Sequence, residues 1–535
     1  MNNKVYKLGR ITMLLVSSLL FIACVDFLDI NKPNTPNSDQ TKGDYYYIGV
    51  HLNKLQESVI LTQQNAYQFN ENLTGQPYAR YMTITKDGWN QHNFNVFSAN
   101  DSWLNSTYND QIVAVYPTWF ELKKILEAED KLGHFTWAWA EVLRVAAVHR
   151  TTDMYGPLPY SEIKKNTGEL AIAFDSQADI YKGLLEDLNS AIDILTTYVL
   201  AGGDSEYSAF KNYDMVYGGK FEQWVKFANS LKLRIAMRMV YVNEAEAKIH
   251  AEAAISHPIG VITSNADNAA IKTSNSNPLF IMWGAYGDTR ACAEMMSYLK
   301  GYGDPRIGRY FQKSSNVAGE DYTGMRFGFD SRGEDWAKEF SAPNVSGNDP
   351  LMWLPAAEVA FTKAEATAIW NWNVGGETAE DLYNEGIRLS FEQWGLSSAQ
   401  ADLYLADGTS IPAAFSDDGN GISAVSTITI KWDDAALDPV KQERILTQKW
   451  LALYPLGHEA WAEHRRTGYP RFFPSSIVHN TDATLRTRGA SRIPYGPMEA
   501  QNNRENYDRA VQLLGGPDAY GTRLWWDVKP GKPNW

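Results

Sequence analysis

Cysteine is almost absent from this chain, which has only two, Cys24 and Cys292, among 535 residues. A disulfide-stapled fold requires many paired cysteines, and cysteine-rich zinc or iron–sulfur sites require several thiolate ligands close together. Both classes are therefore excluded, and the fold has to be stabilised by an apolar core.

Positive charge is also scarce, because 49 Lys and Arg face 63 Asp and Glu, a net charge of −14. Nucleic-acid-binding proteins usually present a basic surface, so we expect no DNA or RNA partner. With 21% charged and 44% hydrophobic residues, the chain has the composition of a folded protein rather than a disordered one. Aromatic residues, in contrast, are abundant at 13%. That surplus of flat apolar surface is the first indication of a binding function.

Long hydrophobic runs are missing except at the N-terminus. Residues 1–10 contain three basic residues and no acid, and residues 11–22 form an apolar run of about 12 positions. This pattern is typical of a signal peptide and is too short to span a bilayer as a helix. The run continues into Phe21-Ile22-Ala23-Cys24, which resembles the lipobox of bacterial lipoproteins, with Phe21 where Leu is usual. We expect cleavage before Cys24 and lipidation of its thiol; an ordinary secreted protein is the alternative.

The sequence therefore predicts three segments: a signal peptide at 1–23, a lipidated flexible tether at 24–43 and a folded domain at 44–535. The tether contains a stretch rich in Pro and Asn, residues 31–38, without apolar periodicity. Asp26 and Asp29 closely follow the lipid cysteine and resemble the signal that sends lipoproteins of Bacteroidetes-type bacteria to the cell surface. We expect the mature protein to be anchored to a membrane by lipid rather than to span it.

Helical periodicity dominates residues 44–535, which predicts an all-α, single-domain fold with minor β-structure at most. After Ser176, apolar residues recur every three to four positions, and the same pattern follows Trp224. Further helices are expected over residues 45–63, 112–131, 137–149, 356–370, 379–394 and 443–465. Long polar stretches, which often carry function, are expected to form loops over residues 74–107, 304–348, 417–426 and 470–535. The best strand pattern lies at residues 424–432.

Motifs along most of the chain, in the same order, resemble those of the SusD/RagB-like family of outer-membrane lipoproteins. They are FLDIN at 27–31, DMYGPLPYSE at 153–162, WVKFANSLKLR at 224–234, DPR at 304–306, EVAF and AEA at 358–366, and RIPY at 492–495. The resemblance implies a helical body with TPR-like helix pairs and an irregular, loop-rich side that carries the ligand site. It also implies a SusC-like TonB-dependent outer-membrane transporter as partner, with the lipoprotein closing the transporter's mouth like a lid at the cell exterior. Because the family's members bind without catalysis, we expect no catalytic residue.

Some of these motif residues also have simple structural explanations. Gly156 and Pro157 are expected to end a helix, because glycine adopts the capping conformation and proline cannot continue the hydrogen-bond ladder. Trp224 is expected to lie in the core. Asp304 and Arg306 are expected to hold a turn by a mutual contact rather than to bind a ligand.

Enzyme-like motifs do not have the spacing that their chemistry needs. His458 and His464 are six residues apart, whereas zinc ligands on one helix are four apart. Glu358 and Glu365 would lie about 10.5 Å apart along one helix axis, whereas the carboxyl groups of glycosidases lie about 5–9.5 Å apart. A surface glycoside hydrolase built on this pair is nevertheless an alternative function. Residues 417–420 (DDGN) lack the full calcium-loop pattern, so we expect a solvated turn there, and no metal or cofactor in the protein.

The loop stretches contain the residue types that recognise sugars. The C–H faces of a sugar stack on Trp and Tyr while its hydroxyl groups bond to Asn, Asp, Gln and Arg, and a peptide needs a similar mixture. The candidate ligand-binding residues are Trp89, Trp283, Tyr286, Trp336, Arg80 and Asn90. Trp103, in contrast, is expected in the core. Oligosaccharide is the expected ligand; a peptide ligand and a purely structural envelope protein are the alternatives.

Overall fold

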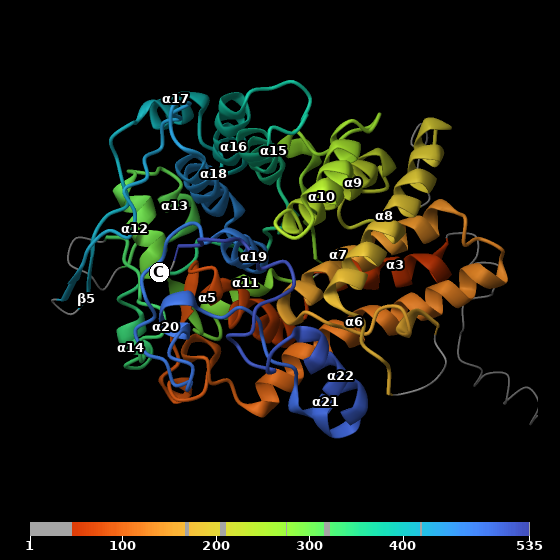
Figure 1. Cartoon of the computed structure of the whole chain (residues 1–535), viewed down its shortest axis with the longest axis horizontal. Coiled ribbons are helices and arrows are strands. Elements are labelled where there is room, and N and C mark those ends of the chain that lie inside the picture. Colours follow the sequence, from red (N-terminus) through yellow and green to blue (C-terminus); the bar gives the residue numbers. More distant parts are fainter. Residues whose placement is uncertain are drawn as a thin grey trace, which may run out of the picture. The chain divides into compact units, whose positions relative to one another are not determined.

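Paired helices make up most of the chain (Figure 1). The computed structural model describes residues 45–165, 171–203, 210–273, 275–314, 321–417 and 420–533. The expected signal peptide, Cys24 and the expected tether lie outside these described residues. The account below concerns residues 50–535, which form one unit. The mainly helical fold expected from the sequence is confirmed.

Two groups of helices, each drawn from one region of the sequence, make up most of the helical body (Figure 1). The first group comprises α7 (Phe135–Tyr155), α8 (Gln177–Leu200), α9 (Phe221–Arg238) and α10 (Glu244–Ile255). The second group comprises α15 (Ala356–Trp370), α16 (Ala379–Gln393), α18 (Asp438–Leu453) and α19 (Gly457–Thr467). Within each group a helix contacts its successor, and α9 contacts α15, so the two groups are joined. Trp224 on α9 is fully buried against Trp139 of α7 and Trp353, so its expected place in the core is confirmed.

The remaining helices are shorter or connect these groups. They are α3 (Tyr46–Val59), α4 (Gln64–Tyr67), α5 (Gly75–Tyr78), α6 (Asp101–Ala128), α11 (Pro278–Trp283), α12 (Ala293–Gly301), α13 (Ile307–Tyr310), α14 (Glu334–Ala337), α17 (Ser398–Ala406), α20 (Leu485–Arg488), α21 (Pro497–Asn502) and α22 (Arg504–Leu514). Single turns of 3-10 or π helix occur at η1 (Gln68–Asn72), η2 (Asp87–Trp89), η3 (Phe94–Val96), η4 (Ile163–Lys165) and η5 (Asn265–Asp267). Within the described ranges, no helix combines the length and the apolar character that crossing a bilayer requires.

Local signals in the sequence set several helix ends. The hydroxyl of Ser176 accepts a hydrogen bond from the backbone N–H of Asp179 at 3.1 Å, which caps α8. Helix α7 ends at Tyr155, where Gly156 takes a φ of +89° and Pro157 follows. Helix α6 begins earlier than predicted, because the side chain of Asn100 caps it inside the stretch expected to be a loop.

Two sequence-based predictions about regular structure are wrong. Residues 443–465 form two helices rather than one, because Pro455 lies between α18 and α19. Residues 424–432 do not form a strand, although alternate side chains are buried as in a strand. The hydroxyl groups of Tyr302 and Tyr383 donate to backbone carbonyls of this segment, so side chains take the place of a partner strand.

Three antiparallel strand pairs are present among the described residues. They are β1 (Met82–Ile84) with β3 (Thr289–Ala291), β2 (Ala269–Ile271) with β4 (Leu351–Leu354), and β5 (Phe415–Asp417) with β6 (Asn420–Ile422). The β1–β3 pair joins two segments about 200 residues apart, and both lead into loops that the sequence analysis expects to bind ligand.

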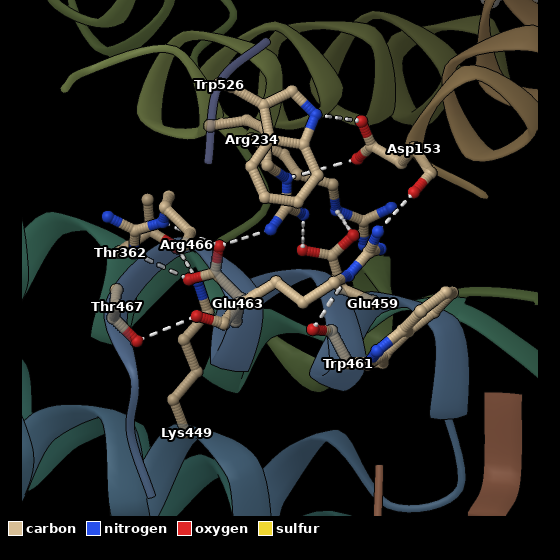
Figure 2. A network of polar contacts seen from close by, with 12 residues as sticks. Asp153, Arg234, Thr362, Lys449, Glu459, Trp461, Glu463, Arg466, Thr467 and Trp526 are labelled. Carbon is tan, nitrogen blue, oxygen red and sulfur yellow. Dashed lines mark hydrogen bonds and ion pairs between the residues drawn. The ribbon is translucent and has the colours of Figure 1, made fainter. Parts of the chain in front are cut away.

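The most unusual feature of the core is α19, which is buried along its whole length despite its polar sequence, GHEAWAEHRRT. Three of its charged side chains, Glu459, Glu463 and Arg466, form ion pairs with neighbouring helices (Figure 2). Arg238 of α9 contacts three carboxylates: Nη1 lies 2.6 Å from Glu463, Nε lies 3.1 Å from Asp153, and Nη2 pairs with Glu459. Burial alone would raise the pKa of Glu459, but Arg238 and Arg234 lower it to about 2.

The same network continues on the other side of Glu463. Lys449 of α18 lies 2.8 Å from one Glu463 oxygen, and Arg466 donates to both oxygens at 3.0 and 2.8 Å. Arg466 also binds Glu365 of α15 at 2.6 Å. Buried ion pairs around α19 therefore connect helices of both groups.

Candidate functional site

The loops that carry the candidate residues are held together next to the β1–β3 pair. The backbone N–H of Thr85 donates to the carbonyl of Asp288 at 3.0 Å, and the Thr85 hydroxyl donates to the carbonyl of Gly287 at 2.6 Å. The hydroxyl of Ser331 in turn donates to the carbonyl of Thr85. Three segments far apart in the sequence, at residues 85–90, 286–291 and 331–337, thus meet at one place.

Asn90 connects the first and third of these segments by two hydrogen bonds. Its side-chain amide donates to the carbonyl of Ser331 at 2.8 Å and accepts from the Ser331 backbone N–H at 2.9 Å. Because both ends of the amide are used, Asn90 fixes the loop that leads to Trp336 in this structure.

Trp89 closes the first loop, at the end of η2, and its side chain is half-buried. Its ring meets Trp103 edge to face, with centroids 5.1 Å apart and an interplanar angle of 88°. Trp103 is 9% exposed and also contacts Phe69 and Phe94, so its expected place in the core is confirmed. The edge-to-face contact with Trp103 in the core therefore orients the ring of Trp89.

Trp283 and Tyr286 follow each other on the second loop, and both are half-buried. Trp283 ends α11 and packs edge to face on Phe280 at 5.9 Å. The hydroxyl of Tyr286 donates to the side-chain oxygen of Asn65 at 3.1 Å, which fixes the direction of the ring.

Trp336 lies on α14, and its ring forms part of an aromatic cluster. Phe329 stacks on it at 5.9 Å, Phe340 meets it edge to face at 4.8 Å, and the Arg332 guanidinium lies 5.4 Å from its centroid. The ring is half-buried, so one part of it remains available to a ligand.

A cavity of about 340 Å³ opens beside Trp336. The side chains around it combine aromatic and polar groups: Trp336, Phe340, Tyr322, Lys300, Ser297 and Glu339. Lys300 is held by Asp321 at 2.5 Å and by the carbonyl of Tyr322 at 2.9 Å. A volume of this size, with an apolar wall and a few oriented polar groups, is typical of a small-ligand site. Lys300 and Ser297 come from α12, a segment that the sequence did not single out.

Arg80 has a different environment from the other candidates, because it is 1% exposed. Its guanidinium lies 3.3 Å from the centroid of Phe327, and its Nε lies 3.6 Å from Glu294. Burial lowers the pKa of Arg80, and Glu294 opposes that effect. The side chain thus lies beneath the loops, at the start of the segment that forms β1, and does not reach solvent in this structure.

The two carboxylates considered for hydrolysis are both used in the buried network. Glu358 is 2% exposed and accepts two hydrogen bonds from Arg234, at 2.6 and 2.7 Å. Glu365 is fully buried and binds Arg466 and Gln442. Burial raises the pKa of Glu358, and Arg234 only partly offsets that increase. Neither carboxylate reaches a solvent-exposed surface from which it could act on a polymer.

The histidines of the zinc-like motif face different partners. His458 Nε2 contacts the carbonyl of Asn70, whereas His464 stacks on Phe472 with centroids 4.4 Å apart. Burial lowers the pKa of His458 to about 3. Across the part of the chain that the structure describes, no three His, Cys, Asp or Glu side chains are grouped to hold a metal ion. Residues 418 and 419 of the DDGN stretch lie outside that part.

Asp304 and Arg306 hold a turn by a mutual contact, as expected from the sequence. Arg306 and Asp304 are both buried and pair at 2.6 Å, and Arg306 also donates to Ser390 at 2.9 Å. This motif holds α12 and α13 against α16 and is not part of the loop site.

Comparison with known proteins agrees with this architecture. The family described as SusD-like, "Susd and RagB outer membrane lipoprotein", matches residues 29–527. A search of curated protein sequences finds no match.

Solved structures resemble the chain over most of its length. A SusD homologue from Bacteroides uniformis is 38% identical with a TM-score of 0.84, covering 90% of this chain and 100% of its own. A chitin-binding SusD homologue from Flavobacterium johnsoniae is 34% identical with a TM-score of 0.85, covering 91% and 100%. A SusD homologue from Bacteroides thetaiotaomicron is 35% identical with a TM-score of 0.82, covering 90% and 99%. The chain belongs to the SusD-like family of nutrient-binding outer-membrane lipoproteins.

Proposed function

We propose that this protein binds an oligosaccharide at the cell surface and delivers it, unchanged, to a SusC-like TonB-dependent transporter. The observation that carries the proposal is that four half-buried aromatic side chains, Trp89, Trp283, Tyr286 and Trp336, lie on loops fixed by hydrogen bonds, with Trp336 lining the cavity. Preformed aromatic surfaces suit the C–H faces of sugar rings, and a fixed loop loses little conformational entropy on binding. A diacylglycerol on Cys24 would hold the protein to the outer membrane, facing the exterior.

The structure also supports binding without chemistry. Among the described residues, Glu339 is the one carboxylate that lines the cavity beside Trp336, whereas glycosidases use a pair. The carboxylates that the sequence offered for such a pair, Glu358 and Glu365, are buried and paired with Arg234 and Arg466 instead. We therefore assign the loop side to capture of the ligand and leave its cleavage to other proteins.

Affinity electrophoresis with intact polysaccharides tests the ligand. We expect migration of the protein to be retarded by at least one glycan and restored by soluble oligosaccharides of the same glycan. Because one relative binds chitin, chito-oligosaccharides belong in the first panel, together with a panel of peptides. If the wild-type protein released reducing ends and Glu358→Gln did not, the protein would be a hydrolase and the assignment would be wrong. If it bound peptides and no glycan, the proposed ligand would be a peptide instead of an oligosaccharide.

Co-purification tests the transporter. The acylated protein extracted from its own outer membrane in mild detergent should bring a TonB-dependent transporter with it in stoichiometric amount. Cys24→Ala is the matched control, because it removes the acyl anchor and leaves the folded domain unchanged. Recovery of the wild-type lipoprotein alone, or from another membrane, would count against delivery to a transporter even if a glycan binds.

A further inference from the structure

Arg465 of α19, unlike Arg466 next to it in the sequence and Arg238 of α9, has no carboxylate within ion-pair distance among the described residues. Its guanidinium lies 3.5 Å from the centroid of Trp461 and 4.9 Å from that of Trp526. It donates only to backbone carbonyls: Nη1 to Asp153 at 2.7 Å and Ser491 at 2.9 Å, and Nε to Trp461 at 3.3 Å. Figure 2 shows three of these neighbours, Asp153, Trp461 and Trp526.

One nitrogen of this guanidinium is left over. Arg465 is only 4% exposed, so water has little access to its side chain. Its Nη2 atom is buried and has no hydrogen-bond partner among the described residues. A buried cation without a counter-ion is costly, and so is a buried donor without an acceptor. Burial accordingly lowers the pKa of Arg465, and Asp153 only partly opposes this effect.

A small cavity of about 30 Å³ lies next to Arg465. The ionisable groups that line it are Arg465, Arg488, Arg523, Lys532, His464 and Asp527. Lys532 pairs with Asp527 and donates to the carbonyl of Arg465 at 2.6 Å, so the single carboxylate already has a cationic partner. The cavity is therefore surrounded by an excess of positive charge.

Two of these cations form an exposed rim. The side chains of Arg488 on α20 and Arg523 reach solvent, and neither donates a hydrogen bond to a described residue. Arg465 is buried behind them. The cavity is thus lined by one buried guanidinium group and by two that reach solvent.

We propose that this cavity binds one small monovalent anion of the size of chloride, between Arg465, Arg488 and Arg523. The volume exceeds the roughly 10–15 Å³ that a cavity needs to hold one water-sized particle and is far below the roughly 300 Å³ of a typical ligand pocket, so a single small ion fits. A bound anion would give Nη2 of Arg465 an acceptor and would place a negative charge next to the three guanidinium groups. Bound there, it connects α19 and α20 to the C-terminal segment through Lys532.

Thermal unfolding of the mature chain in chloride or gluconate, at constant ionic strength, tests this proposal. We expect the melting temperature to rise with chloride and reach a plateau, but not with gluconate, which is too large for the cavity. For Arg523→Gln, the chloride concentration that gives half of the rise should be about tenfold higher, the loss that one charged hydrogen bond produces.

Arg509→Gln is the matched control, because Arg509 on α22 is also exposed but does not line the cavity. It should keep the wild-type chloride response. Crystals soaked in bromide should show an anomalous peak within hydrogen-bond distance of Arg465 Nη2. Equal responses to chloride and gluconate, or the absence of that peak, would overturn the proposal.

Discussion

Replacing Arg238 with Leu should lower the free energy of unfolding by about 3–5 kcal/mol, the cost of removing one member of a buried ion pair. Arg238 is fully buried and contacts Asp153, Glu459 and Glu463. Without it, three carboxylates would remain in the core with too few cations. The loss is therefore the penalty of the uncompensated carboxylates rather than the value of a single contact.

Urea unfolding followed by circular dichroism measures this loss. Arg388→Leu is the matched control, because Arg388 pairs with Asp402 at the surface, and such pairs contribute about 0–1 kcal/mol. Arg238→Lys keeps the charge but not the planar fork, so it should fold and lie between wild type and Arg238→Leu. If the Arg388 and Arg238 variants lost equal stability, the buried network would not be the main support of α19.

Replacing Trp336 or Trp89 with Ala should weaken ligand binding by about 1–3 kcal/mol, as expected for the loss of an aromatic anchor in an interface. Trp336 borders the cavity and keeps part of its ring exposed, and Trp89 is oriented by Trp103. At about 1.4 kcal/mol per factor of ten, the dissociation constant should rise between about fivefold and 150-fold.

Calorimetric titration with the ligand found by electrophoresis measures this change. Trp370→Ala is the matched control: Trp370 is a half-buried tryptophan at the end of α15, away from the three loops. It should leave the affinity unchanged. Unchanged affinity in both loop variants would show that the ligand binds elsewhere.

The helical framework was predictable because its signals are local. Apolar periodicity placed α15 at residues 356–370 with the observed bounds, and the Ser176 cap marked the start of α8. Pro455 could have divided the predicted helix at 443–465, since proline interrupts the hydrogen-bond ladder.

Helix α19 could not be placed in the core from its sequence. A helix with this many charged residues normally lies at the surface. Its burial depends on Arg238, more than 200 residues away, and on Lys449 of α18. The sequence of α19 alone therefore does not predict that Arg238 and Lys449 pair with it.

The candidate site was predictable in part, by residue type. The loop tryptophans were found because aromatic residues stood in polar stretches, and the structure leaves them half-buried. The burial of Arg80 beneath Phe327 and the use of Asn90 to hold Ser331 depend on contacts about 240 residues apart. Lys300 borders the cavity only because β1–β3 pairing and α12 packing bring it there.

The bonds that hold the loops together have a consequence for how this surface can be altered. Asn90, Thr85 and Ser331 each bond to main-chain atoms of another loop rather than to a side chain. Every amino acid except proline offers the same main-chain groups. Aromatic residues between these three anchors can therefore be exchanged without replacing the anchors, and this makes the loop surface a template for redesigning which nutrient the protein captures.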